Sequence, residues 1–387
     1  MSTHVEDQQG NGSSGRRTIR AAVLERLDAE RPFEQSRPLT VGEVELDPPA
    51  GRELLVQIEA AGICHSDLSV VDGVRPRPVP MLLGHEACGR VIATGPEVTD
   101  LAVGQRVVMT FLPRCGECDA CRTDGVRPCT TGSVSNGTGD LIGGGSRLSR
   151  GGERVHHHLG VSGFATHAVV DERSVVPVGD DVPPAIAAVM GCAVLTGGGA
   201  VINAGRPVAG DTVVVVGLGG VGMAALLTAL ALEDVRVVGV DASDDKLVTA
   251  RELGAHEALS PAEAVERGLE AAVVIEAAGS ARAFETAVAL TGPGGRTVTV
   301  GLPPESAMAS VSPLRLVAGG RSIIGSYLGS AVPSRDIPIF VEMWRAGRLP
   351  VEHLITSTIS LDDVNRGMDD LADGRALRQV IEFGTDA

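Results

Sequence analysis

Five consecutive β-branched residues, 212–216, lead directly into a glycine-rich turn at 217–222. A continuous run of this kind is typical of a parallel strand buried on both faces. The glycines follow in the G-x-G-x-x-G spacing, which permits a tight turn, close approach of a pyrophosphate and close packing of a helix on the strand. The sequence therefore predicts a dinucleotide-binding turn, whose expected coenzyme contacts are Gly217, Gly219, Gly220, Val221 and Gly222.

Strand and helix patterns alternate after this turn. Apolar segments at 235–240, 272–275 and 296–300 are separated by helical patterns at 246–253 and from 282 onward. Such alternation predicts right-handed βαβ units in a parallel sheet, and so an α/β fold of the Rossmann type.

Asp241 stands nineteen residues beyond Gly222, at the end of the next expected strand. A carboxylate there would accept hydrogen bonds from the adenosine ribose and repel a 2′-phosphate, which favours NAD over NADP. The alternative is that Asp241 is an ordinary carboxylate in a turn at the end of a strand.

The N-terminal half has a different pattern. From about 19 to 180, short alternating segments are broken by Gly and Pro, which predicts mostly β structure. The stretch 130–157 is dense in Gly, Ser and Thr and lacks periodicity, so we expect a long loop there. After 325, helical patterns at 335–346 and 361–373 precede a strand through Val380 and Ile381.

Composition narrows the function classes. The chain has 387 residues, which suits two domains, and a net charge of -16 without clustered Lys or Arg, which argues against nucleic acid. We expect no apolar run long enough to cross a bilayer, and hence no membrane partner. Residues 1–18 are polar and lack the apolar core of a signal peptide, so we expect a disordered lead and a cytoplasmic protein.

Four of the seven cysteines lie within fifteen residues, at Cys115, Cys118, Cys121 and Cys129. Thiols in a chain without an export signal are expected to be reduced, so their spacing indicates metal chemistry before disulfides. Four thiolates can close a tetrahedral zinc site, which leaves no open position and is therefore structural. An iron–sulfur cluster or a redox dithiol remains an alternative.

Three further candidates are scattered: Cys64, His85 and Cys192. Each alone could be a buried thiol or a satisfied core histidine. Together, two thiolates and one imidazole make a three-ligand zinc site that keeps its fourth position open for water or substrate. Such a site would be catalytic.

From about 19 to the C-terminus, the chain resembles the zinc-containing medium-chain alcohol dehydrogenases. The resemblance rests on 62–67, Gly84-His85-Glu86, the segment 115–129 that holds the four closely spaced cysteines (hereafter the lobe), Gly191-Cys192, and the glycine-rich turn with Asp241. It implies a GroES-like catalytic domain at 19–193, an NAD-binding domain at 194–327, and a C-terminal part, 328–387, that returns to the catalytic domain.

The resemblance also implies roles for individual residues. Cys64, His85 and Cys192 would bind the catalytic zinc and the lobe cysteines a structural zinc, two zinc ions per chain. Asp67 would orient His85, Glu86 would lie behind the metal, and Cys88 is left for the core. Further contacts to the coenzyme would come from His65, Thr196, Lys246, Val300, Gly301, Leu302 and Arg378, although Lys246 and Arg378 could equally be solvated charges.

The implied reaction is hydride transfer between an alcohol and nicotinamide. Zinc would lower the pKa of the alcohol hydroxyl, and Ser66 would accept its proton. The family relay ends in a histidine where this chain has Ser69, which leaves His65, Ser69 or water as the proton exit. Phe111, Val134 and Leu302 would line an apolar pocket that favours apolar or aromatic alcohols, primary or secondary, and their aldehydes or ketones.

Other possibilities stay open. A thiol-adduct formaldehyde dehydrogenase is disfavoured by Ser133, where an Arg would bind a glutathione carboxylate. A zinc- and dinucleotide-binding relative without turnover is a different class, against which the intact Cys64, His85, Cys192 and Ser66 argue. We expect His156, His157 and His158 to be solvated surface, and the family suggests a homodimer or homotetramer.

Overall fold

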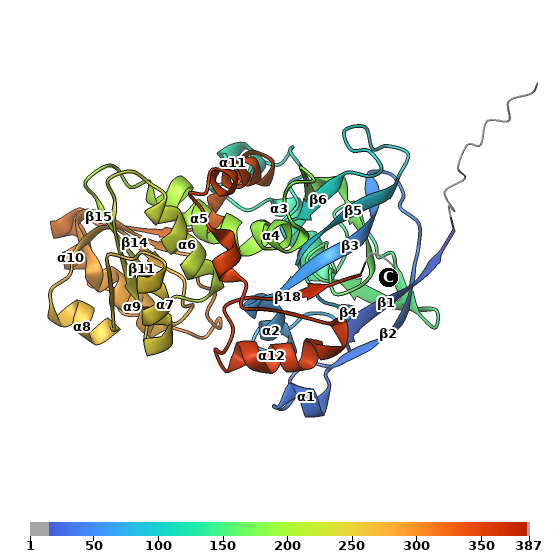
Figure 1. Ribbon diagram of the computed structural model, residues 1–387, viewed down its shortest axis with the longest axis horizontal. Helices are drawn as coiled ribbons and strands as arrows, with labels where there is room; N and C mark the ends of the chain where they lie inside the picture. Colours follow the sequence, from blue (N-terminus) through green and yellow to red (C-terminus); the bar gives the residue numbers. More distant parts are fainter. Residues whose placement is uncertain (1–14, 385–387) are drawn as a thin grey trace, which may run out of the picture.

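Six parallel strands form the sheet that holds the glycine-rich turn (Figure 1). The computed structural model describes residues 15–384, in which this sheet has the strand order β13-β12-β11-β14-β15-β16. This is the order 3-2-1-4-5-6 of a dinucleotide-binding fold, so the predicted Rossmann sheet is confirmed. Its strands are β11 (Thr212–Val216), β12 (Arg236–Val240), β13 (Glu257–Leu259), β14 (Ala271–Glu276), β15 (Thr291–Thr299) and β16 (Ser322–Gly325).

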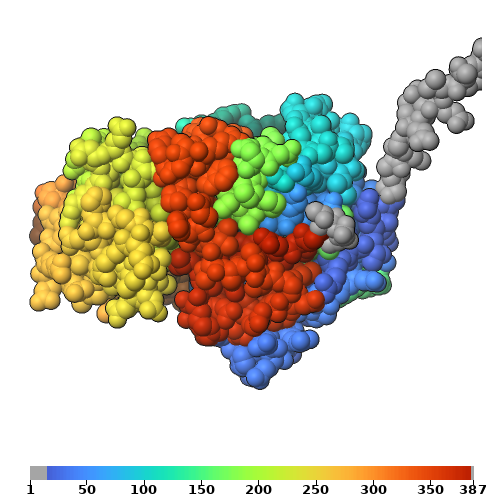
Figure 2. Space-filling view, viewed as in Figure 1, coloured from blue at the N-terminus to red at the C-terminus, as the bar shows by residue number. Residues whose placement is uncertain are grey.

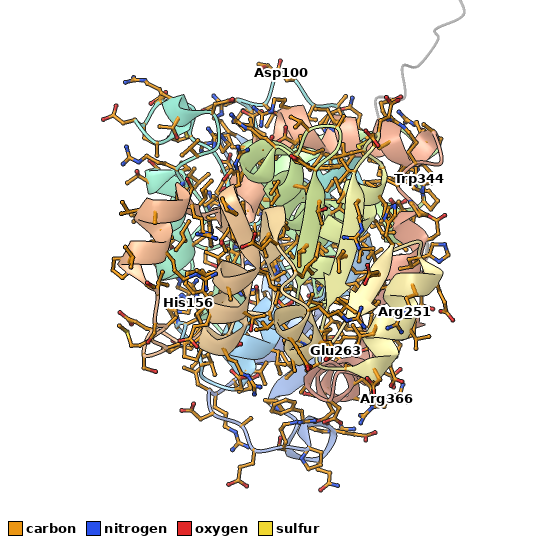
Figure 3. The ribbon with its side chains drawn as sticks, turned by 90° about the vertical axis from the view of Figure 1, so that its left-hand side faces the viewer. Asp100, His156, Arg251, Glu263, Trp344 and Arg366 are labelled. Atoms are coloured by element: carbon orange, nitrogen blue, oxygen red, sulfur yellow. The ribbon has the colours of Figure 1, made fainter. Side chains whose placement is uncertain are left out.

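Strand β11 is buried on both faces. Val213 and Val215 belong to a large apolar cluster that includes helix α6, whereas Val214 and Val216 belong to a second cluster on the other face. This placement explains why every residue of the run is β-branched. The helices of this unit are α6 (Gly220–Leu230), α7 (Asp244–Glu252), α8 (Pro261–Glu266), α9 (Ala281–Leu290) and α10 (Pro313–Gly319). This unit faces the viewer in Figure 3, where Arg251 of α7 and Glu263 of α8 are labelled.

The predicted β-rich half consists of a closed barrel and an open sheet. The barrel has the strand order β1-β2-β7-β8-β4, and the open sheet β10-β6-β5-β3-β18-β17, with β9 also paired to β3. The bounds are β1 (Arg17–Leu24), β2 (Leu39–Leu46), β3 (Glu53–Ile63), β4 (Met81–Leu82), β5 (Glu86–Thr94), β6 (Arg106–Met109), β7 (Leu148–Arg150), β8 (Glu153–His157), β9 (His167–Asp171), β10 (Val175–Val178), β17 (Ser357–Ile359) and β18 (Gln379–Glu382), with helices α1 (Phe33–Ser36) and α2 (His65–Val71) between strands.

The prediction of a long loop at 130–157 is wrong. Helix α3 (Thr130–Thr138) begins this stretch, and the hairpin of β7 and β8 follows and closes the barrel against β2 and β4. The helix has a weak intrinsic propensity, but Cys129 caps it by accepting a hydrogen bond from Gly132 N, and Asn136 donates to the carbonyl of Phe111 at 2.7 Å. Tertiary contacts therefore override a sequence that reads as a loop.

A long apolar helix precedes the parallel sheet in the chain. It runs over Pro184–Gly205 and includes α4 (Pro184–Val189), α5 (Leu195–Gly199) and two π-helical turns, Met190–Val194 and Ala200–Gly205. By length and hydropathy it could cross a membrane, which corrects our expectation that no run is long enough, but 89% of its most apolar window is buried inside the protein. We therefore interpret it as a core helix between the two halves, and it carries Cys192.

The C-terminal part returns to the β-rich half. Figure 2 shows residues after about 330, in orange-red, on the face between the yellow part that holds the parallel sheet and the blue part that holds the barrel. Strand β18 pairs antiparallel with β3 and parallel with β17. The helices of this part are α11 (Pro333–Arg345) and α12 (Val364–Ala372). Of the expected disordered lead, 1–14 lies outside the described residues, whereas Arg17 and Thr18 already belong to β1.

Candidate functional site

The four lobe cysteines converge. Their sulfur atoms all lie within 4.8 Å of one another, with 3.9 Å between Cys115 and Cys121 and 4.0 Å between Cys118 and Cys129. Thiolates at the corners of a tetrahedron with Zn–S bonds of about 2.3 Å would be roughly 3.8 Å apart, so the observed spacing fits a zinc ion. Backbone hydrogen bonds from Thr130 and Cys121 lower the pKa of the Cys118 thiol to about 5, which favours the thiolate that a metal needs.

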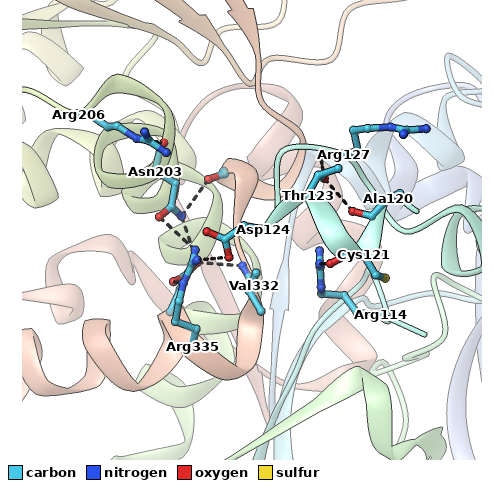
Figure 4. Close-up of polar contacts among 12 residues, drawn as sticks. Arg114, Ala120, Cys121, Thr123, Asp124, Arg127, Asn203, Arg206, Val332 and Arg335 are labelled. Atoms are coloured by element: carbon cyan, nitrogen blue, oxygen red, sulfur yellow. Dashed lines mark hydrogen bonds and ion pairs between the residues drawn. The ribbon is translucent and has the colours of Figure 1, made fainter. Parts of the chain in front are cut away.

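An arginine of the C-terminal part forms an ion pair with the lobe (Figure 4). Arg335 of α11 forms an ion pair of 2.7 Å with Asp124, which follows the short helical turn Cys121–Thr123 inside the lobe, and a second ion pair with Asp336. Asn203, from the end of the long apolar helix, donates to Asp336 at 3.1 Å. The lobe therefore has a defined position relative to that helix.

A second cluster of donors is buried between the two halves. The ligand atoms of Cys64, His85, Glu86 and Cys192 all lie within 4.8 Å of one another, and Cys192 Sγ is 3.4 Å from His85 Nε2. Cys64 precedes α2, His85 precedes β5, and Cys192 lies in a π-helical turn, a feature that is frequent at functional sites. Two sulfurs and one imidazole at these distances match the donor set of an open zinc site.

Charges inside this cluster are strongly coupled. A hydrogen bond from the Cys192 thiol, more than any other cause, holds the pKa of Cys64 well below its usual range. Burial raises the pKa of Glu86 to about 8, against the attraction of Arg378. A thiolate at Cys64 suits a divalent cation, whose charge would offset the negative groups collected here.

Asp67 holds the cluster from behind. Its side chain accepts hydrogen bonds from the backbone N–H groups of Cys64 and Gly84, at 3.0 and 3.1 Å, and its Oδ1 lies 3.1 Å from Nδ1 of His85. Although burial opposes it, the charge of His85 holds the pKa of Asp67 at about 2. The carboxylate thus fixes the His85 ring with Nε2 directed at the cysteines.

The expected surface position of the three histidines is wrong for two of them. His157 is fully buried, and His158, 1% exposed, has its Nδ1 at 3.2 Å from Oδ1 of Asp67. His156 alone is partly exposed. The histidines were misjudged because the barrel strand β8 was not predicted, and in a strand entering the core such side chains become buried.

Glu86 and Arg378 connect this cluster to the glycine-rich turn. Nε of Arg378 lies 3.4 Å from Oε1 of Glu86, and its Nη1 donates to the carbonyl of Ile63 at 2.9 Å. A Cβ atom on Gly220 would lie only 2.8 Å from Arg378 Nη2, so this guanidinium packs directly on the turn. Arg378 is buried, which removes the alternative that it is a solvated charge.

The turn has the geometry that phosphate binding requires. Gly217 has a φ of +92°, and a Cβ on Gly222 would lie 1.7 Å from the Gly217 carbonyl oxygen, so neither position accepts a side chain. A Cβ on Gly219 would instead meet nothing within 4 Å. Open space at this point, beside the N-terminus of the eleven-residue helix α6, fits the approach of a pyrophosphate.

Asp241 follows β12 at the carboxyl edge of the sheet. Its carboxylate accepts hydrogen bonds from Leu218 N at 2.6 Å and Ser243 N at 2.9 Å, and Lys246 Nζ lies 3.8 Å away. The residue therefore shapes a turn, as the alternative expected, and also lies beside the glycine-rich loop, as a ribose contact requires.

Glu276 is a residue that the sequence analysis missed. It ends β14, next to β11 where the strand order reverses, and is 1% exposed. Its carboxylate accepts hydrogen bonds from Ala278 N, Gly279 N and the Thr299 hydroxyl, at 2.6–2.9 Å, and its carbonyl accepts one from Val300 N. A glutamate ending an otherwise apolar strand was the available signal, and here it orders the loop that contains Gly301.

A cavity lies over the buried cluster. Ser66, His85, Phe111, Leu302 and Tyr327 are among its lining residues, and the Phe111 ring packs edge-on against those of His85 and Tyr327 at 5.7 and 5.6 Å. Tyr327, Arg75 and Arg77 also line this cavity, and the sequence analysis did not predict them.

The structure corrects one expected pocket residue. Val134 is 62% exposed on α3, because the helix turns this side chain to solvent. Of the remaining candidates, Thr196 is buried one turn after Cys192, and His65 is exposed at the start of α2. The Ser69 hydroxyl donates to the carbonyl of His65 at 2.8 Å, within its own helix.

Known proteins resemble the whole chain. Residues 50–180 match the alcohol dehydrogenase GroES-like domain, and 220–345 match the zinc-binding dehydrogenase domain. An alcohol dehydrogenase zinc-binding domain protein from Burkholderia ambifaria is 30% identical, with 95% of this chain and 100% of the other covered and a TM-score of 0.88.

Two further structures add to the comparison. Benzyl alcohol dehydrogenase from Acinetobacter calcoaceticus is 31% identical over 95% of this chain and 100% of its own, with a TM-score of 0.87. A protein described as a short chain alcohol dehydrogenase from E. coli CFT073, complexed with NADH, is 25% identical over 95% of this chain and 99% of its own, with a TM-score of 0.76. The chain belongs to the zinc-containing alcohol dehydrogenases of the medium-chain dehydrogenase/reductase family, and is thus an oxidoreductase of the zinc-binding type with a GroES-like and a Rossmann domain.

Proposed function

We propose that this protein is a zinc-dependent, NAD-linked alcohol dehydrogenase that interconverts aromatic or apolar alcohols with aldehydes or ketones. The observation that carries the proposal is the convergence of Cys64, His85 and Cys192 within 4.8 Å, at the wall of a cavity that Ser66 also lines. The benzyl alcohol dehydrogenase among the similar structures supports an aromatic substrate.

The donor sets fit two zinc ions. Cys64, His85 and Cys192 would hold one and the four lobe cysteines the other. The first supplies a Lewis acid that lowers the pKa of a hydroxyl bound at its open position. Asp67 keeps the imidazole in the tautomer that presents Nε2, and Glu86 with Arg378 encloses the cluster on the side of the coenzyme turn.

Other residues of the site would carry the alcohol proton away or bind the coenzyme. Ser66 lines the cavity beside His85, where its hydroxyl can take a proton from the alcohol. Ser69 already donates to a backbone carbonyl, which favours His65 or water over Ser69 as the next acceptor. The coenzyme would lie along Gly217–Gly222, with Arg378 and His65 toward its phosphates and Thr196, Val300, Gly301 and Leu302 around the nicotinamide.

NAD, rather than NADP, is the proposed coenzyme because Asp241 stands beside the glycine-rich loop, where its charge would repel a 2′-phosphate. Asp241→Ala should raise the KM for NAD and lower that for NADP. If the ratio of kcat/KM for the two coenzymes does not change, Asp241 does not contact the ribose.

The direct test is formation of NADH absorbance with benzyl alcohol and simple alkanols, on protein whose zinc content has been measured. Turnover with two zinc equivalents per chain is the expected result. Two zincs without turnover of any alcohol would favour a non-catalytic relative, and fewer than two would remove the metal assignment.

We further propose a cytoplasmic homo-oligomer. β16 is an edge strand of the parallel sheet, and beside it Leu314 and Val317 of α10 are 75% and 83% exposed. Apolar exposure next to an unpaired edge fits a contact with a second copy. Light scattering on purified protein should give a dimer or tetramer, and a monomer would contradict it.

A further inference from the structure

Two arginines line the cavity over the buried cluster. Arg75 and Arg77 follow α2 and face the same space as His85, Phe111 and Tyr327. An alcohol pocket built only for apolar molecules has no need of guanidinium groups, because burying a positive charge is costly unless an anion compensates it. These two residues therefore require an explanation.

Neither arginine has an acidic partner. Arg75 donates to the carbonyl of Leu302 at 3.1 Å and Arg77 to the carbonyl of Asn136 at 3.0 Å, and within 15–384 no carboxylate forms an ion pair with either. Nε of Arg77 is buried and has no hydrogen-bond partner among the described residues. By contrast, the buried Arg106 and the half-buried Arg147 each have a carboxylate at 2.7 Å.

The electrostatics agree with this geometry. Burial lowers the pKa of Arg77, and although Tyr327 opposes the effect, the charge of Arg75 adds to it. Burial also raises the pKa of Tyr327, so this residue keeps its hydroxyl proton and can donate it. The pocket thus combines an aromatic wall, from Phe111 and Tyr327, with positive charge that the protein leaves uncompensated.

We propose that the alcohol substrate carries a carboxylate, which Arg77 binds with the help of Arg75, while an apolar or aromatic body lies against Phe111 and Tyr327. The proposal rests on the alcohol dehydrogenase activity proposed above and narrows its substrate class. A planar guanidinium can bind both oxygens of a carboxylate, which fixes the orientation of the molecule as well as its affinity.

The test compares acids with their uncharged esters. We expect kcat/KM for 4-(hydroxymethyl)benzoate, or for the meta isomer, to exceed that for the corresponding methyl ester and for benzyl alcohol by roughly 10- to 100-fold, the effect of one charged hydrogen bond. Arg77→Gln should remove this preference, with little change for benzyl alcohol, and Arg77→Lys should restore part of it. Arg26→Gln, at an exposed position of the barrel, controls for the loss of one positive charge.

Each contrary result has a separate meaning. If benzyl alcohol is oxidised but no acid is preferred over its ester, the inference is wrong and the proposed function stands. If Arg77→Gln lowers kcat/KM equally for acid and ester, or weakens NADH binding in a direct titration, the arginine supports the fold or the coenzyme, and the inference is again wrong. If no alcohol is turned over by protein that holds both zincs, the proposed function itself fails.

Discussion

The two donor clusters differ in how the chain builds them. The lobe takes four cysteines from fifteen consecutive residues, most of them partly exposed, and backbone N–H groups hold their sulfurs. The buried cluster takes its donors from three segments, with His85 and Cys192 separated by 107 in residue number, and the carboxylate of Asp67 orients one of them. His85 of the buried cluster also lines a cavity.

This difference separates two uses of a metal ion. A site assembled from one loop contributes free energy to that loop and to its position against α11, and can be lost without changing the other cluster. A site assembled from distant segments depends on the whole fold and has room for a reacting molecule. The predictions below test that separation.

Cys64→Ser should have the largest effect on activity. Loss of a direct ligand should lower kcat by more than the roughly 10- to 100-fold that loss of an outer partner costs, while the lobe keeps its metal. Elemental analysis should find one zinc per chain and a circular dichroism spectrum like that of the unmodified protein. Cys88→Ala is the matched control, because Cys88 is a buried thiol outside both clusters. Turnover by Cys64→Ser would remove the assigned ligand.

Cys118→Ser should act on stability instead. We expect the free energy of unfolding to fall by several kcal/mol as the lobe loses its metal, because metal binding is coupled to folding. At low temperature, kcat per folded molecule should change little. Denaturant unfolding of the same preparation measures the loss of stability. A loss of kcat as large as that of Cys64→Ser would show that the two clusters are not separate.

Asp67→Asn should have an intermediate effect, confined to the buried cluster. The amide keeps the size of the side chain but loses the charge that orients His85, so zinc affinity or kcat should fall roughly 10- to 100-fold. Metal content under competition with a chelator distinguishes the two clusters. Equal zinc loss from both, or none, would contradict the role given to Asp67.

Acid should weaken the barrel that supports the buried cluster. His157 accepts a hydrogen bond from Arg147 N at Nε2 and lies 3.3 Å from the Ser162 hydroxyl, and burial lowers its pKa to about 3. Because the folded pKa is below the unfolded value of about 6.5, this stabilisation is present above pH 6.5 and is lost as the pH falls toward 3. At pH 5 the loss should be about 2 kcal/mol.

Unfolding at pH 7.5 and pH 5 measures this effect, with His157→Gln for comparison. The variant should be less stable at neutral pH but should lose less stability on acidification. The same pH dependence in both proteins would show that His157 is not the group that takes up the proton.

Sequence patterns predicted the parallel sheet and the lobe because both depend on local signals. The run Thr212–Val216 coincides with β11, and four cysteines at short spacing can meet without knowledge of the fold. The prediction that Cys64, His85 and Cys192 form one site came from the family resemblance and not from periodicity.

The failures have a common cause in long-range packing. Helix α3 and β8 form from segments of weak propensity that the barrel stabilises, so the burial of His157 and His158 and the exposure of Val134 could not be read locally. Nothing in the local sequence distinguishes Arg75 and Arg77 from other arginines, whereas the fold places both at the wall of the cavity. The residues that we propose to set specificity are thus the least visible in the sequence.

The position of β18 has a consequence for biosynthesis. This strand lies between β3 and β17, more than three hundred residues after its partner β3, whereas the parallel sheet uses only 212–325. On the ribosome, the part that holds the parallel sheet can fold as soon as it emerges. The open sheet, by contrast, stays incomplete until 379–382 have been synthesised. Arg378 directly precedes them, so a chain released before residue 378 would lack the guanidinium that joins Glu86 to Gly220 and would leave an unpaired strand edge open to aggregation.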